Sequence, residues 1–168
     1  MAAIDFDGDG KPELFGQNVN SGQVYLYKLN GNQWISGQYL NQTVNGSSQQ
    51  LIIPSGWKIR AMGDMNYDSI PDLIVQNTTT YETKIYYLNS AGTVNNIAAI
   101  TPQINAGWRI CGVGDFNRDG QLDLIGQNET TNQVFFYYQD KTYSNLTYSG
   151  AYLNPTPNQA WRIMGYKW

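Results

Sequence analysis

The chain contains three copies of one sequence unit, and this repetition limits its possible folds more than any other feature. The copies begin at Asp5, Asp64 and Asp115, so successive copies are 59 and 51 residues apart. Twelve residues after each of these aspartates comes a Gln-Asn pair. A Trp-(Lys/Arg)-Ile sequence begins seven residues before the second and third copies and occurs again near the C-terminus. Because several markers keep the same phase, the chain is an array of units of about 50 residues.

Each unit has the pattern of short strands separated by clusters of Asn, Gly, Ser and Thr. In the third unit we expect strands at residues 108–113, 124–127, 133–138 and 148–153. No apolar pattern with helical spacing extends beyond a turn or two, so helices should be scarce. Four strands at this period favour a propeller blade over a coil of a β-solenoid. The predicted fold class is all-β, a β-propeller with three four-stranded blades per chain, at approximately residues 3–62, 63–113 and 114–168.

The acidic segments have the pattern Asp-x-(Asp/Asn)-x-Asp-(Gly/Ser)-x-x-(Asp/Glu), which places oxygen ligands for one hard cation at positions 1, 3, 5 and 9 and a backbone carbonyl at position 7. We expect them to bind Ca²⁺. The predicted side-chain ligands are Asp5, Asp7, Asp9 and Glu13 in loop one, Asp64, Asn66, Asp68 and Asp72 in loop two, and Asp115, Asn117, Asp119 and Asp123 in loop three. The predicted carbonyl ligands belong to Lys11, Ile70 and Gln121.

The distribution of acidic residues supports this interpretation. Of the 13 Asp and Glu residues, 10 lie in the three loops, and clustered carboxylates repel one another unless a cation compensates. Glycine at position 6 permits the positive φ that such a tight turn needs. Loop two departs from the pattern with Ser69 at this position, where a side chain makes a positive φ costly, so we expect lower calcium occupancy there than in loops one and three. A single Asp-Gly turn would need no metal, but three acidic loops at the same place in the repeat favour metal binding.

The units resemble the FG-GAP/VCBS-type repeats, the calcium-binding blades of integrin-α-like β-propellers. The resemblance is carried by Gly114-Asp-Phe-Asn-Arg-Asp-Gly-Gln-Leu-Asp123, by the Trp-Arg-Ile sequence at residues 108–110 and by their counterparts. It implies that each loop joins the first and second strands of a blade and that calcium is mostly structural. An EF-hand would use the same ligands but would require a helix after the loop, whereas Leu-Phe-Gly-Gln-Asn or Leu-Ile-Gly-Gln-Asn follows instead.

The recurring aromatic and amide residues allow two interpretations. The tryptophans could pack neighbouring blades together, and the glutamines could be buried amides that bind neighbouring backbone. Alternatively, they form repeated ligand sites between blades, where sugar faces lie on aromatic rings and hydroxyl groups pair with amides. The candidate ligand-binding residues are Trp57, Trp108, Trp161, Gln17, Gln76, Gln127, Arg109 and Arg162, with Lys58 at the equivalent basic position. Cys111 is expected to be a small buried hydrophobic residue.

Composition excludes several functional classes. The chain has no histidine and one cysteine, which removes His-based catalysis and Cys-rich metal sites. Its net charge of −3 and the lack of a basic run argue against nucleic acid, and no apolar stretch is long enough for a membrane span. Only Glu82, Glu129 and Asp140 lie outside the acidic loops, so we expect no enzymatic activity. No signal peptide is visible, although calcium loops of this kind suit an extracellular or cell-surface location.

Two functions therefore remain. The first is a calcium-stabilised, lectin-like propeller with repeated carbohydrate sites between blades. The second is a protein-binding or adhesive propeller scaffold without sugar specificity. The first predicts a pocket at each blade, whereas the second predicts one coherent apolar patch on a single face.

The chain is also expected to associate with itself. Three blades cannot close a ring, because propellers generally use 4–8 blades. The first unit has no Trp-(Lys/Arg)-Ile sequence before its loop and is expected to lack an inner strand, whereas residues 161–166 are a spare one. We expect this spare strand to complete the first blade of another copy. A head-to-tail homodimer would then close a six-bladed ring.

Overall fold

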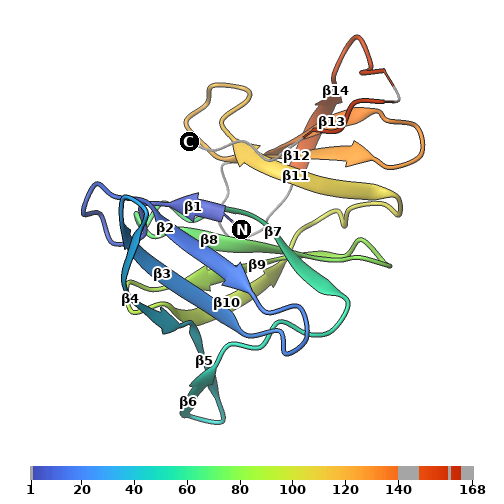
Figure 1. The fold of residues 1–168 in the computed structure, drawn as a ribbon. Coiled ribbons are helices and arrows are strands. Elements are labelled where there is room, and N and C mark those ends of the chain that lie inside the picture. The colour runs from blue at the N-terminus through green and yellow to red at the C-terminus, as the bar shows by residue number, and fades with distance from the viewer. Residues whose placement is uncertain (1, 140–147, 159, 164–168) are drawn as a thin grey trace.

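The computed structural model describes residues 2–139, 148–158 and 160–163, and these residues form strands and no helix (Figure 1). The expected all-β class is confirmed. The strands form three separate sheets, and none of them closes on itself. The first sheet contains, in chain order, β1 (Ala2–Ile4), β2 (Glu13–Gln17), β3 (Val24–Asn30) and β4 (Gln33–Tyr39). The third sheet contains β11 (Trp108–Gly114), β12 (Asp123–Asn128), β13 (Val134–Gln139) and β14 (Tyr148–Tyr152).

The second sheet has six strands where the sequence predicted four. Its repeat unit is β7 (Trp57–Gly63), β8 (Asp72–Asn77), β9 (Thr83–Leu88) and β10 (Thr93–Ala99). A hairpin of β5 (Asn41–Val44) and β6 (Ser47–Gln50) extends it, because β5 pairs in parallel with β10. The hairpin turns at Asn45-Gly46, and both residues have positive φ, 50° and 77°. An Asn-Gly pair is a strong hairpin signal, but it lies in a polar stretch that no repeat marker covers.

The three repeat units have the same strand register. Leu14 pairs with Tyr27 in the first sheet, as Leu73 pairs with Tyr86 in the second and Leu124 with Tyr137 in the third. The inner strands β7 and β11 also share a register shift, between Ile59 and Ala61 and between Ile110 and Gly112. The repetition of sequence is therefore a repetition of structure. The expected fourth strand of the last unit is confirmed as β14.

The expectation that the first unit lacks an inner strand is wrong. Ala2–Ile4 forms β1, which pairs with Glu13–Phe15 of β2. The strand is shorter than β7 and β11, each of seven residues. The expected spare strand at 161–166 lies only partly within the described residues, and its residues 161–163 are not assigned to a strand. Residues 164–166 lie outside the described residues.

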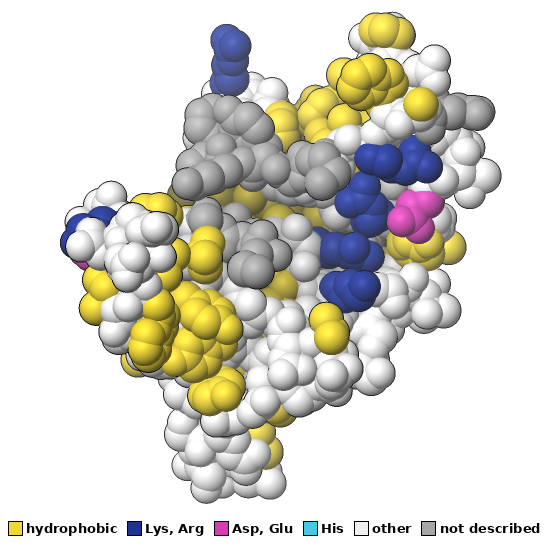
Figure 2. Space-filling model, in the orientation of Figure 1, with side chains coloured by type: hydrophobic (Ala, Val, Ile, Leu, Met, Phe, Trp, Pro, Cys, Tyr) yellow, Lys and Arg dark blue, Asp and Glu magenta, His cyan; other side chains and the backbone are white. Residues whose placement is uncertain are grey.

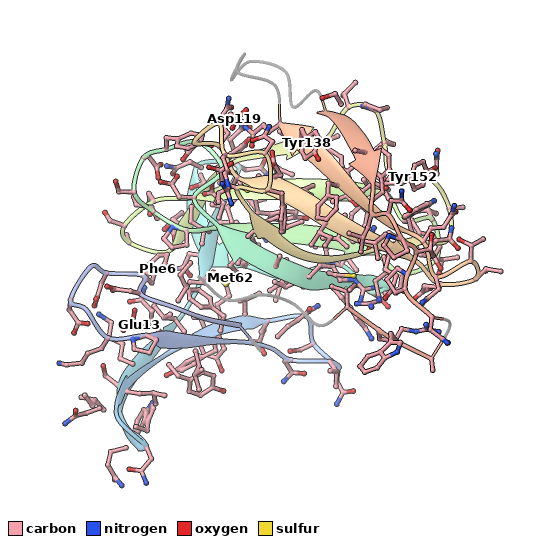
Figure 3. All side chains as sticks on the ribbon, turned by 90° about the horizontal axis from the view of Figure 1, so that it is seen from above. Phe6, Glu13, Met62, Asp119, Tyr138 and Tyr152 are labelled. Carbon is pink, nitrogen blue, oxygen red and sulfur yellow. The ribbon has the colours of Figure 1, made fainter. Side chains whose placement is uncertain are left out.

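The sheets pack face to face, and two apolar cores lie between them. In the second and third sheets, we call the face that points toward the preceding sheet the front face and the opposite face the back face. In the first sheet, the back face is the one that packs on the second sheet, and the front face is the opposite one. The back face of the first sheet (Phe15, Val24 and Leu26) packs on the front face of the second (Leu73, Val75 and Tyr86). Ile74 and Ile85 of the second sheet's back face pack likewise on Leu124, Phe135 and Tyr137 of the third sheet's front face. Figure 3 shows Phe6 of loop one beside Met62 of β7, and both belong to the first of these cores.

Candidate functional sites

The three acidic loops share one network of hydrogen bonds. The carboxylate at position 1 accepts bonds from backbone N–H groups later in the loop, as Asp64 does from Asp68 (3.1 Å) and Ser69 (2.8 Å) and Asp115 from Asp119 (3.1 Å) and Gly120 (3.0 Å). In all three loops, the side-chain oxygen of position 3 accepts a hydrogen bond from the backbone N–H of position 5. The side-chain oxygen of position 5 accepts one from the backbone N–H of position 7. This network holds all three loops in the same tight turn, but among the described residues only loop one brings three carboxylates within 4.8 Å of one another.

The predicted need for positive φ is confirmed at position 6 and also applies to position 4. Position 6 is Gly10, Ser69 and Gly120, with φ of 83°, 68° and 86°. Position 4 is Gly8, Tyr67 and Arg118, with φ of 77°, 62° and 63°. Loop two therefore adopts the same backbone as the other two loops despite its serine, at the steric cost of a side chain in the left-handed region.

Loop one brings three carboxylates together. Oxygen atoms of Asp5, Asp7 and Glu13 all lie within 4.8 Å of one another. Lys28 of β3 places its Nζ 2.5 Å from Asp7 Oδ2, and this contact lowers the pKa of Asp7 and raises that of Lys28. In loops two and three, position 3 is an asparagine whose Nδ2 donates to the aspartate at position 5. The lysine thus compensates the additional carboxylate of loop one.

The acid at position 9 is buried and fastens each loop to its sheet. Asp72 accepts bonds from the N–H groups of Met65 and Leu88, both at 3.0 Å, and Asp123 accepts from Phe116 (2.9 Å) and Gln139 (3.0 Å). Burial is the largest influence on Asp72 and raises its pKa to about 7, against the lowering effect of these hydrogen bonds. Burial also raises the pKa of Asp123. A bound cation would favour the ionised form of both carboxyl groups.

The donor set of the loops fits calcium. It consists of carboxylate, amide and carbonyl oxygens, and it contains no sulfur or imidazole. Hard oxygen donors in a flexible loop are what Ca²⁺ prefers. In addition, the buried amide oxygen of Gln121, at position 7 of loop three, has no hydrogen-bond partner in the described part of the chain.

The repeated glutamines join each sheet to the next stretch of chain. Gln76 donates from Nε2 to the carbonyl of Trp108 (2.9 Å), and its Oε1 accepts from the N–H of Ile110 (3.1 Å). Gln17 makes the same pair of bonds with Trp57 and Ile59, and Gln127 makes it with Trp161 and Ile163. We call this arrangement the glutamine clamp. It matches the buried-amide interpretation, which the sequence left open beside a ligand-binding one.

The recurring tryptophans occupy three different environments. Trp108 is 9% exposed and lies in the core between the second and third sheets, with its ring centroid 6.2 Å from that of Phe135. Trp57 is partly buried, and the Nζ of Lys84 lies 4.6 Å from its ring centroid. Trp161 is 69% exposed. The structure therefore gives Trp108 a packing role and leaves only Trp161 mostly open to solvent.

A polar cluster lies where the second sheet meets the third, and its members Arg60, Tyr81 and Glu129 were not among the predicted site residues. Tyr81 donates its hydroxyl to Glu129 Oε2 (2.7 Å), and Arg109 Nε lies 3.7 Å from Glu129 Oε1. The Nε atom of Arg60 is buried without a hydrogen-bond partner among the described residues. Burial, and then the neighbouring Arg109, lower the pKa of Arg60. We call Arg60, Tyr81, Arg109 and Glu129 the boundary cluster.

The boundary cluster could have been found only in part from the sequence. Arg109 belongs to a repeated motif, but Arg60 stands at the register shift of β7, where the third unit has Cys111. Cys111 is buried as predicted, and burial raises the pKa of its thiol. Figure 2 shows basic side chains in a row, with an acidic neighbour, on this side of the molecule. Of the other predicted basic residues, Lys58 and Arg162 are exposed.

Comparison with known proteins agrees with the repeated architecture. The FG-GAP-like repeat family matches the chain twice, over residues 5–75 and 64–126. No curated protein was found to match the chain. The described residues contain no helix that could cross a membrane. The two family matches together cover more than half of the chain and include all three acidic loops, so the protein belongs to the FG-GAP-like repeat family.

Proposed function

We propose that the protein is a calcium-stabilised binding module of the β-propeller type, with carbohydrate as its ligand class. The boundary cluster is the observation that carries the binding part of the proposal. It combines donors and acceptors at a junction between repeats, and one of its donors, Arg60 Nε, is buried and has no hydrogen-bond partner among the residues that the structure describes. A buried polar atom without a partner is costly, so a ligand oxygen at this position would relieve the cost.

Calcium is proposed for all three loops. The support is the shared network of hydrogen bonds, the positive φ at two positions of each loop, and the three clustered carboxylates of loop one. When bound, the ion would supply positive charge that offsets the mutual repulsion of these acids. The residues themselves hold the turn in shape and fasten it to the sheet through Asp72, Asp123 and Glu13, the last accepting a bond from the N–H of Phe6 (2.7 Å).

Carbohydrate suits the chemistry of the boundary cluster. Sugar hydroxyls both donate and accept, so they can meet the guanidinium groups of Arg60 and Arg109 as well as the carboxylate of Glu129. The chain as a whole has few charged residues, 14%, and 14% aromatic residues, which agrees with a neutral, hydroxyl-rich ligand. Two boundary clusters, one in each chain of the proposed dimer, would gain affinity through multivalency.

Protein binding is the second candidate, and one surface favours it. The front face of the first sheet exposes Tyr27 (38%) and Tyr39 (41%), whose neighbour Tyr25 contacts both rings. Figure 2 shows a hydrophobic patch over this sheet. A coherent apolar patch on one face is what an adhesive scaffold would present.

We propose no enzymatic activity, because the described acids outside the loops do not form a pair: Glu129 is held by Tyr81 and Arg109, and the carboxylate of Glu82 lies 3.1 Å from Lys84 Nζ. Asp140 lies outside the described residues. An extracellular or cell-surface location suits the proposed calcium sites, which fill at extracellular calcium levels. The proposed quaternary form is a six-bladed ring made by two chains, since propellers generally need 4–8 blades.

A glycan array with and without EDTA tests the proposed function. The wild type should bind glycans in calcium, and binding should fall when the metal is removed. Arg60→Met and Glu129→Gln should each lower glycan binding at least tenfold, the effect of about 1.4 kcal/mol. Gln49→Met, at an exposed position of β6 outside every predicted site, is the control and should bind as the wild type does. Absence of glycan binding at millimolar concentration would exclude a lectin and leave the protein-binding candidate.

A further inference from the structure

We infer that the front face of the first sheet is a docking surface for a second copy of this chain. The surface of the second copy that packs on it is the back face of its third sheet. The docking rests on the proposed ring and is independent of calcium and sugar binding. The structure already contains this type of contact twice, between the first and second sheets and between the second and third. In both cases a back face meets a front face.

The front face of the first sheet matches the front face of the third residue by residue. Leu14, Gly16, Tyr25, Tyr27, Gly37 and Tyr39 have the same register as Leu124, Gly126, Phe135, Tyr137, Gly150 and Tyr152. The aromatic contacts repeat as well, since the ring centroids of Tyr25 and Tyr27 are 4.7 Å apart and so are those of Phe135 and Tyr137. On the third sheet this face packs against the second sheet. On the first sheet it is open, with Tyr27 at 38% exposure against 6% for the equivalent Tyr86.

The back face of the third sheet offers the complementary surface. Position 2 of each acidic loop lies on the back face: Phe6 is 5% exposed and Met65 is 1% exposed, each in a core between sheets. The equivalent Phe116 is 37% exposed, and its ring contacts Phe136 with centroids 4.9 Å apart. Ile125 and Phe136 have the register of Phe15 and Leu26, which cover the second sheet. Ile125 is already buried in a small cluster with Val134, against which Phe136 and Ile163 pack, so the exposed apolar part of this back face centres on Phe116 beside the half-buried Phe136.

Backbone pairing points to the same partner. The glutamine clamp of the third sheet holds Trp161–Ile163 as the other two clamps hold the beginnings of β7 and β11. The turn before each tryptophan also repeats, with Trp57, Trp108 and Trp161 donating to the carbonyl three residues earlier. On β2, however, β1 pairs only with residues 13–15, and Gly16 and Gln17 have no described partner on that edge. Trp161–Ile163 of the second copy fits there, with Arg162 opposite Gln17 as Lys58 is opposite Gln76.

Light scattering of single variants and of their mixture tests this docking. The wild type should have a mass near twice 18.9 kDa. Tyr27→Glu on the front face and Phe116→Glu on the back face should each give monomers. An equimolar mixture of the two variants should form dimers again. In a mixed pair, the unchanged back face of the Tyr27→Glu chain meets the unchanged front face of the Phe116→Glu chain, so one of the two contacts is intact. Val19→Glu, at a 90% exposed apolar position in the β2–β3 turn, is the control and should remain dimeric.

The alternatives give distinct results. If the dimer formed front face to front face, only Tyr27→Glu would become monomeric. Mixing Tyr27→Glu with Phe116→Glu would then not bring the Tyr27→Glu chains back into dimers. A wild-type monomer at micromolar concentration would overturn the proposal, and so would a Phe116→Glu dimer. Circular dichroism of each variant checks that the sheets are formed, so that loss of association is not confused with unfolding. Glycan binding by the monomeric variants would show that the proposed function stands even if the docking fails.

Discussion

At the scale of single residues, equivalent positions in the repeats have taken different roles. The Trp of the Trp-(Lys/Arg)-Ile sequence is buried at 108 and 69% exposed at 161. Position 3 of the acidic loops is Asp7 with a lysine partner in the first unit and asparagine in the other two. Repeat phase therefore predicts where a side chain lies on its strand, but the neighbouring sheet decides whether that side chain is covered.

Trp108→Ala is expected to destabilise the protein by about 3–5 kcal/mol, because it removes a large side chain from the core between the second and third sheets. Trp34→Ala, at a 63% exposed position on β4, is the control and should change stability by no more than about 0.5 kcal/mol. Urea unfolding of both variants measures the difference. A stable Trp108→Ala variant that has lost glycan binding would instead assign this residue to a ligand site.

Lys28→Met is expected to strengthen calcium binding in loop one by roughly threefold to tenfold, because the lysine competes with the metal for Asp7 and repels it. Lys84→Met on β9 removes a comparable lysine that pairs with Glu82, away from the acidic loops, and should leave calcium affinity unchanged. Calorimetric titration with CaCl₂ provides the comparison. Weaker calcium binding in Lys28→Met would mean that the lysine organises the loop.

At the scale of elements, the sequence predicted the parts that repeat and missed the parts that occur once. The strands of the third unit and the loops were predictable because alternation, turn residues and phase all agree. The β5–β6 hairpin was missed because all of its β6 side chains are exposed, so no buried stripe marks the strand. The parallel pairing of β5 with β10 joins residues that are about 50 positions apart, and no local pattern specifies it.

The candidate sites follow the same division. The loops that carry the proposed calcium ligands were predictable because their spacing is local, and all three loops have positive φ at the same two positions. The boundary cluster was not, because Tyr81 and Glu129 come from different repeats and meet only when the second and third sheets pack. Arg60 was hidden for a further reason, since the register shift in β7 turns it away from the repeated pattern.

Ser69→Gly is expected to stabilise the protein by about 1 kcal/mol, because Ser69 has a φ of 68° and glycine adopts this conformation without the steric penalty of a Cβ. Ser48→Gly in β6 is the matched control, and it should be neutral or destabilising, because glycine in a strand costs conformational entropy. Thermal melting of the two variants tests the expectation. A lower melting temperature for Ser69→Gly would mean that the serine hydroxyl makes a contribution that outweighs the backbone strain.

At the scale of the whole molecule, three sheets with the same four-stranded repeat unit pack back face to front face. A glutamine clamp joins each sheet to the next stretch of chain. The acidic loops lie at equivalent positions in all three units, so bound calcium would stabilise the stack at three places. Binding to the folded state alone contributes about 2.7 kcal/mol per site at a hundredfold excess over Kd. Stability of the proposed module should therefore depend strongly on the metal.

We propose that calcium in the three repeated loops stabilises this FG-GAP-like protein. Calorimetric titration of the metal-free chain with CaCl₂, followed by thermal melting of the same sample, tests it most directly. We predict three calcium ions per chain and a melting temperature that rises with Ca²⁺, falls with EDTA and does not respond to Mg²⁺. Absence of binding heat, together with a melting curve that EDTA leaves unchanged, would show that the loops fold without a metal.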